Sequence, residues 1–176
     1  MNIPNQLTMG RIIMIPIFIV VYMLGYNYWA AAIFIVAAAT DALDGHLARK
    51  WNLISNFGKI MDPLADKLLV MAALVCMVEI GTVAGWMVIV ILGREFLISG
   101  FRAVAAAQGI VIAAGTTGKI KTILQMVAIP LLLLENWPFA LFTSIPVDQI
   151  ILWAAVVMTI VSGAEYIIKN IGVFKE

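Results

Sequence analysis

Long apolar runs separated by short polar breaks dominate this chain. Most of these runs approach the roughly 20 residues that a helix needs to cross about 30 Å of hydrocarbon. The pattern predicts helical spans at about residues 12–24, 29–48, 58–78, 86–107, 119–134 and 149–168. A polar opening at residues 1–7 is expected to lie at the membrane surface. We therefore predict an all-α integral membrane protein with six transmembrane helices after a short interfacial segment.

Composition supports a bilayer as the solvent of this chain. Hydrophobic residues make up 64% of it and charged residues 12%, whereas an ordinary soluble domain is about half apolar and a quarter charged. No internal repeat or polar domain interrupts the pattern, which predicts one membrane domain over residues 1–176. The net charge of +1 gives no indication of nucleic-acid binding. A single cysteine, Cys76, and a single histidine exclude an internal disulfide and the usual zinc sites.

Basic residues predict how the spans are oriented. The loops at residues 25–28, 79–85 and 135–148 contain no Lys or Arg. Basic side chains instead flank the connection between the second and third spans, begin the fifth span and lie in the tail: Arg49, Lys50, Lys59, Lys119, Lys121, Lys169 and Lys175. The positive-inside rule then places both termini and the segment 41–66 on the cytoplasmic side of the cell membrane.

Four aspartates stand out within residues 41–66. Asp41 and Asp44 are three residues apart, and Asp62 and Asp66 are four apart, so each pair shares one helix face. Four unpaired carboxylates would repel one another, and divalent cations that prefer hard oxygen ligands relieve this repulsion. Two such ions about 4 Å apart stabilise both oxygens of a phosphoryl displacement. The spacing favours a Mg²⁺ or Mn²⁺ site over a solvated helix end whose aspartates pair with nearby Lys and Arg.

Glycines and cations accompany these aspartates. Gly45 and Gly58 lack a Cβ and let a ligand lie close against the helices, while Arg49 and Lys59 can neutralise a pyrophosphate at the rim. His46 directly follows Gly45 and is interpreted as a bystander.

The motif Asp41-x-x-Asp44-Gly45-x-x-Ala48-Arg49, eight further residues and Gly58-x-x-x-Asp62-x-x-x-Asp66 resembles the signature of the CDP-alcohol phosphatidyltransferases at every defined position. The resemblance extends to six spans with the motif between the second and third. It implies displacement of CMP from a CDP-linked lipid by an alcohol, with two divalent ions, by a protein that is commonly a homodimer.

The resemblance also implies roles for individual residues. Asp41, Asp44 and Asp62 would hold metal, and Asp66 would hold metal and act as the general base. The CDP-lipid would contact six residues: Asn5, Thr8, Gly45, Arg49, Gly58 and Lys59. Asn5 and Thr8 share a helical face with Arg11, and by themselves these three are more typical of an interfacial cap.

Further basic residues bear on the acceptor alcohol. Arg94 and Glu95 lie near the middle of the fourth predicted span, with Arg102 two turns later. Lys119 and Lys121 begin the fifth helix, where a helix N-terminus favours anions. A mid-span arginine is costly and should face a polar cavity or a partner. The four cations predict an acceptor that carries its own phosphate, and an internal Arg–Glu pair is the alternative for Arg94.

The segments NIPNQLTMGRI, REFLISGFR and GKIKTILQM resemble the branch of the family that uses CDP-diacylglycerol and glycerol 3-phosphate. The products would be phosphatidylglycerophosphate and CMP, on the route to phosphatidylglycerol. Inositol phosphate explains the basic residues equally well, whereas serine and phosphatidylglycerol explain fewer of them. From other classes, a small divalent-metal transporter would spread acidic residues over several spans, and a structural membrane subunit would have no need of the motif.

Overall fold

The described residues of the computed structural model are 3–51, 56–110, 112 and 115–170, and they form a helical protein. Its helices are α1 (Ile3–Met23), α2 (Asn27–Trp51), α3 (Asn56–Ile80), α4 (Gly85–Ala107), α5 (Thr116–Leu133) and α6 (Val147–Asn170), with a 3₁₀ turn, η1 (Phe139–Leu141), before α6. Each predicted span coincides with one of these helices. The all-α prediction is therefore confirmed within the described residues.

Helix α1 begins earlier than the apolar run predicts. The helix starts at Ile3, in the polar opening of the chain, and continues without a break into the apolar run. Pro4 lies in the first turn, where its missing N–H has no helical partner to lose. The opening of the chain is therefore part of the first helix, and its position at a membrane surface stays a prediction.

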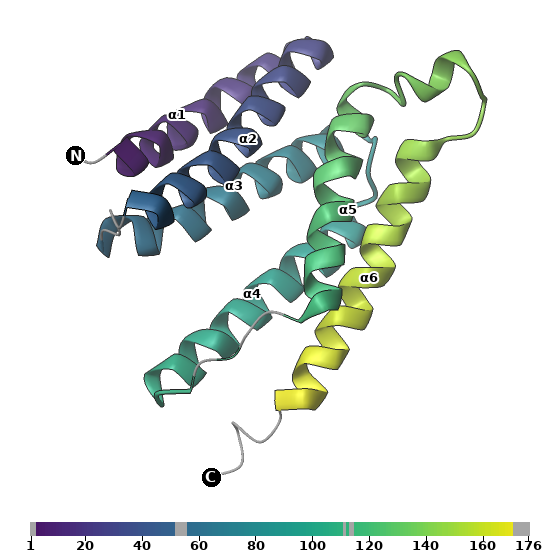
Figure 1. Ribbon diagram of the computed structural model, residues 1–176. Coiled ribbons are helices and arrows are strands. Elements are labelled where there is room, and N and C mark those ends of the chain that lie inside the picture. Colours follow the sequence, from purple (N-terminus) through teal and green to yellow (C-terminus); the bar gives the residue numbers. More distant parts are fainter. Residues whose placement is uncertain (1–2, 52–55, 111, 113–114, 171–176) are drawn as a thin grey trace. The chain divides into compact units, whose positions relative to one another are not determined.

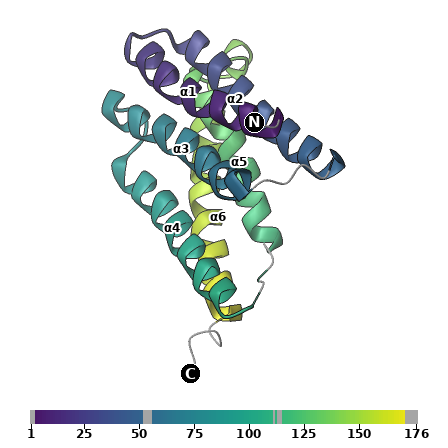
Figure 2. The same ribbon diagram turned by 90° about the vertical axis from the view of Figure 1, so that its left-hand side faces the viewer.

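The chain divides into two compact units, residues 1–80 and 81–176. In the first unit α1 packs along α2 and α3, as Figures 1 and 2 show from two sides. Phe18 forms the centre of its core, with ring centroids 5.9 Å from Tyr22 and 6.2 Å from Phe34. Fully buried Ala30 and Ala37 on α2 have small side chains that allow close helix packing.

In the second unit α6 packs along α5 and also contacts α4 (Figure 1). Phe101 of α4 meets Tyr166 of α6 edge-on, with ring centroids 5.7 Å apart. The connection between α5 and α6 is closed by Asn136, whose amide donates to the Ile145 carbonyl at 2.9 Å and accepts from the Asp148 N–H at 3.2 Å. Helix α6 therefore has a fixed start and two packing partners.

Two stretches of the described residues are long and apolar enough to cross a membrane, Gln6–Met23 in α1 and Val147–Asn170 in α6. Only 22% of the first and 33% of the second are buried, whereas the core helix of a soluble protein would be mostly buried. Exposed apolar side chains also occur on other helices, such as Ile89 on α4 and Ile123 on α5. These features are typical of helices solvated by lipid, and the count of six spans stays a prediction.

Candidate functional site

The second aspartate pair lies on α3. Asp62 and Asp66 are half-buried one turn apart, and Gly58 is buried one turn before Asp62. The hydroxyl of Thr8 on α1 donates a hydrogen bond to Asp62 Oδ1 at 2.5 Å. The predicted glycine and two predicted carboxylates therefore share one helix face, and α1 supports that face through Thr8.

The first aspartate pair lies in α2, because that helix includes residues 41–51. The side chains of Asp41, Asp44 and Arg49 are outside the described part of the structure, as are those of Asn5 and Lys59 and the surroundings of Gly45. Their predicted roles therefore stay predictions. Helices α2 and α3 pack against each other within the first unit, as the motif requires.

Two polar residues of α1 are buried. Thr8 is 0% and Arg11 1% exposed. Arg11 Nε donates to the Ala37 carbonyl on α2 at 3.2 Å, and the Thr40 hydroxyl donates to the same oxygen at 2.7 Å. The shared face of Thr8 and Arg11 thus points into the unit and ties α1 to both α2 and α3. Sequence reasoning placed Thr8 at the CDP-lipid and missed its bond to Asp62, because 54 residues separate the two.

The donor chemistry around Asp62 fits a magnesium or manganese ion. Among the described residues no group of three or more His, Cys, Asp or Glu side chains is placed to hold a metal. That search reaches only half of the predicted set, because the Asp41 and Asp44 side chains are not described. The half that is described consists of two carboxylates on one face, one of them already oriented by a hydroxyl donor. Hard oxygen ligands of this kind suit Mg²⁺ and Mn²⁺.

The second unit contains a partly buried charge cluster. Glu95 Oε1 accepts a hydrogen bond from Arg94 Nη1 at 3.0 Å and also pairs with the ammonium of Lys121 on α5. The Lys121 side chain is 2% exposed and that of Arg94 15%. Two of the four cations predicted for the acceptor phosphate are thus brought together on one carboxylate. The other two, Arg102 on α4 and Lys119 on α5, are exposed.

The internal Arg–Glu pair considered from the sequence is present, but it leaves part of Arg94 unused. Arg94 Nε is buried and has no hydrogen-bond partner among the described residues. A pocket of about 270 Å³ beside it is lined by Arg94, Thr159, two glycines and six aliphatic side chains: Ile89, Val90, Leu97, Ile98, Ile160 and Ile167. The pocket itself is mostly apolar, so the indication of an anion comes from the unpartnered Nε, because a buried donor without a partner is able to bind an oxyanion.

Two glycines make room for Arg94. A Cβ on Gly118 of α5 would lie 3.3 Å from Arg94 Nη2, and one on Gly163 of α6 would lie 3.1 Å from Arg94 Cγ. Such distances are tighter than most Cβ contacts, so a side chain at Gly163 would require Arg94 to shift by a few tenths of an ångström. Gly118 is the first residue of the segment GKIKTILQM quoted from the sequence, whereas no sequence feature pointed to Gly163.

The first turn of α5 is also fastened to α6. The Thr117 hydroxyl donates to Glu165 Oε2 at 2.7 Å, and Lys169 pairs with the other oxygen of the same carboxylate. The helix start that carries Gly118, Lys119 and Lys121 is thus held at Thr117 by α6 and at Lys121 by Glu95 of α4.

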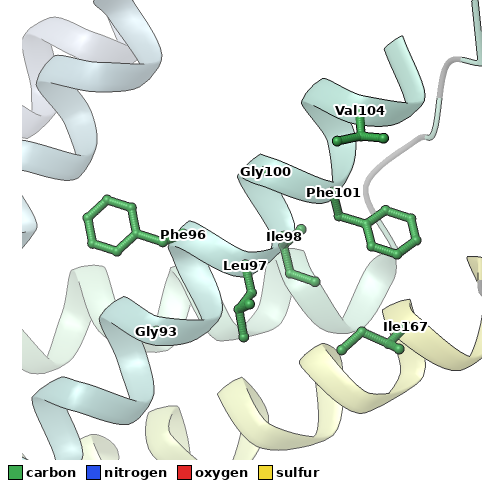
Figure 3. Close-up of a pocket in the computed structure, with 8 residues that line it drawn as sticks. All are labelled: Gly93, Phe96, Leu97, Ile98, Gly100, Phe101, Val104 and Ile167. Carbon is green, nitrogen blue, oxygen red and sulfur yellow. The ribbon is translucent and has the colours of Figure 1, made fainter. Parts of the chain in front are cut away.

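A larger pocket of about 720 Å³ lies along α4 and α6. Figure 3 shows Leu97, Ile98, Phe101, Val104 and Ile167 around it, all of them apolar. Two glycines and Phe96 of α4 complete its lining. A hollow of this kind does not suit a phosphate, so the polar candidate of this unit is the cluster around Arg94.

Comparison with known proteins identifies the family. The model of the CDP-alcohol phosphatidyltransferases matches residues 1–161. The chain belongs to the CDP-alcohol phosphatidyltransferase family. A relative from Bacillus subtilis (strain 168), named CDP-diacylglycerol–glycerol-3-phosphate 3-phosphatidyltransferase, is 46% identical over 184 residues, which cover 96% of this chain and 95% of the relative.

Two further relatives carry the same name as the Bacillus subtilis protein. One from Rickettsia felis is 37% identical over 168 residues, covering 94% of this chain and 93% of its own length. One from Pseudomonas fluorescens is 43% identical over 143 residues, covering 76% of this chain and 72% of its own length. Family membership agrees with the resemblance of the motif that spans α2 and α3.

Proposed function

We propose that this chain transfers the phosphatidyl group of CDP-diacylglycerol to glycerol 3-phosphate, giving phosphatidylglycerophosphate and CMP. The observation that carries the proposal is the 46% identity over 96% of the chain to a relative named for that reaction. The basic cluster of Arg94 and Lys121 adds independent support, because it suits an acceptor that brings its own phosphate.

The reaction replaces the phosphoanhydride bond of the CDP-lipid with a phosphodiester bond to the acceptor. The acceptor hydroxyl loses its proton to the Asp66 carboxylate, and its oxygen bonds to the β-phosphorus of CDP-diacylglycerol. The bond between that phosphorus and the oxygen of CMP breaks, and CMP leaves. Asp66 can take this part because its side chain is half-buried on α3, one turn from Asp62, rather than fully enclosed.

Asp41, Asp44, Asp62 and Asp66 would hold two Mg²⁺ or Mn²⁺ ions. When bound, such ions neutralise the charge on the diphosphate and on the leaving phosphate. The Thr8 hydroxyl orients Asp62 for this task through its hydrogen bond. Gly45 and Gly58 would lie against the nucleotide, with Asn5, Arg49 and Lys59 around the diphosphate.

The protein is proposed to lie in the cell membrane with six spans, and with the motif and both termini facing the cytoplasm. The apolar surfaces of α1 and α6 support insertion, and the basic loops support this orientation. A homodimer is expected because it is common in the family. In this arrangement a bilayer lipid and a water-soluble alcohol both reach the motif.

Purified protein with CDP-diacylglycerol, Mg²⁺ and glycerol 3-phosphate is expected to release CMP, as measured by a coupled or chromatographic CMP assay. Inositol phosphate, serine and phosphatidylglycerol serve as the comparison acceptors. CMP release with inositol phosphate and none with glycerol 3-phosphate would refute the choice of acceptor. Metal flux into liposomes, without CMP release in the presence of any of these acceptors, would favour a transporter instead.

Thr8→Val is expected to raise the Mg²⁺ concentration needed for half-maximal activity by about tenfold. The reason is that residues which orient a metal ligand typically contribute 10- to 100-fold to metal affinity or activity. The measurement is CMP release over a Mg²⁺ titration. Thr8→Ser keeps the hydroxyl donor and should restore the wild-type requirement. An unchanged Mg²⁺ requirement in Thr8→Val would show that the bond to Asp62 has no role in metal binding.

A further inference from the structure

Glu95 has an unusual position for a carboxylate in the middle of an apolar helix. It belongs to α4, yet its Oε1 is shared by the neighbouring Arg94 and by Lys121 of α5. The Ser99 hydroxyl donates to the Glu95 backbone carbonyl at 2.6 Å, within the same helix. Its side chain is 21% exposed, so it is partly shielded from solvent. The proposed reaction assigns this residue no role.

The net charge of the cluster favours the binding of one more anion. Arg94 and Lys121 each carry one positive charge and Glu95 one negative charge, which leaves one positive charge among the three. Two cations in this partly buried cluster would repel each other, so the Glu95 carboxylate that both contact stabilises the empty site. A phosphate monoester carries about 1.5 to 2 negative charges near pH 7 and suits the remaining positive charge.

The geometry of the Arg94 guanidinium shows which edge is available. Glu95 accepts from Nη1. The opposite edge of a guanidinium consists of Nε and Nη2, which together can hold an oxyanion bidentately. Nε has no partner among the described residues, and Nη2 lies beside Gly118, 3.3 Å from where a Cβ on that residue would stand. Glu95 therefore holds the arginine by the one nitrogen that this edge does not use.

We propose that Glu95 is a positioning residue of the acceptor site. It holds Lys121 and the Nη1 side of Arg94 so that the Nε–Nη2 edge of Arg94 faces the phosphate of the acceptor alcohol. Gly118 and Gly163 keep the space that this orientation requires. This inference rests on the proposed function, because it names how the acceptor's phosphate is recognised.

Glu95→Gln is expected to raise the KM for glycerol 3-phosphate about tenfold and to leave the KM for CDP-diacylglycerol within about twofold. The expected size is that of one charge-assisted hydrogen bond. The measurement is CMP release by the purified, detergent-solubilised full chain with each substrate varied in turn. In two separate double-mutant cycles, Glu95→Gln should add little when combined with Lys121→Met or with Arg94→Ala.

The outcomes separate this inference from the proposed function. Absence of CMP release by the wild-type protein with glycerol 3-phosphate would refute the proposed function. A wild-type enzyme that does release CMP, together with an unchanged or lowered acceptor KM in Glu95→Gln, would overturn the positioning role alone. Equal increases of both KM values, or full additivity in the cycles, would also overturn it by showing a general role in the fold.

A second pair of variants tests the same geometry without changing any charge. Gly163→Ala places a Cβ 3.1 Å from Arg94 Cγ, whereas Gly100→Ala on α4 meets nothing within 4 Å. Both changes raise helix propensity, so neither should weaken its helix. Gly163→Ala is expected to raise the glycerol 3-phosphate KM at least about threefold over Gly100→Ala. Equal KM values in the two variants would refute the proposal even if Glu95→Gln does not fold.

Discussion

Asp66→Asn is expected to lower CMP release about 10³-fold, or below detection, while CDP-diacylglycerol remains bound. An amide cannot accept the proton of the acceptor hydroxyl, and general-base catalysis is typically worth about 10²- to 10⁴-fold. The amide has nearly the shape of the carboxylate, so α3 should keep its packing against α1 and α2. The measurements are the initial rate of CMP release and equilibrium binding of radiolabelled CDP-diacylglycerol.

The matched control for Asp66→Asn is Glu79→Gln. Glu79 lies on the same helix, near its other end, and is exposed. Its neutralisation should change the rate by less than about twofold, as is usual for an exposed carboxylate. Near-normal turnover in Asp66→Asn would rule out the general-base role. Loss of CDP-diacylglycerol binding together with turnover would instead assign Asp66 to the binding of the donor through metal.

Arg94→Ala is expected to raise the KM for glycerol 3-phosphate between about tenfold and 100-fold. A charge-assisted contact of a mostly buried guanidinium is worth about 1.5 to 3 kcal/mol. Lys119→Ala and Arg102→Ala should have smaller effects, about twofold to threefold, because both side chains are exposed and screened by solvent. The KM for CDP-diacylglycerol should change less than that for the acceptor in all three variants.

The contrast between buried and exposed cations is what makes this series informative. The KM for glycerol 3-phosphate of each variant is measured from steady-state CMP release at two ionic strengths. Added salt should weaken the contributions of Lys119 and Arg102 more than that of Arg94. An equal rise of both substrate KM values in Arg94→Ala would argue against a separate acceptor site. A larger loss in Lys119→Ala than in Arg94→Ala would move the acceptor to the exposed start of α5.

Much of the fold could be predicted from the sequence, because each helix contains a long apolar run that the hydrophobic pattern reveals. The predicted spans coincide with α1 to α6, and the turns at Gly25 and Gly81 lie where polar residues interrupt the runs. The start of α1 could not be predicted in the same way. Its first turns are polar, and hydropathy alone does not distinguish a polar helical turn from an irregular surface segment.

The spacing of the aspartates already determined that Asp62 and Asp66 share a helix face, because an α-helix repeats every 3.6 residues whatever surrounds it. The resemblance carried by the same motif agrees with the family to which the chain belongs. These conclusions depend on local geometry or on residue identity. Tertiary structure is not needed for either.

Only the tertiary structure decided which distant residues meet. Thr8 bonds to Asp62 across 54 residues, and Glu95 reaches Lys121 across 26. The place of Arg94 against Gly118 and Gly163 depends on how three helices pack. No spacing rule relates such positions, since helix packing brings them together through side-chain volume and the pairing of buried charges. The sequence therefore determined the chemistry of the carboxylates, and packing determined which side chains hold them and the basic cluster in place.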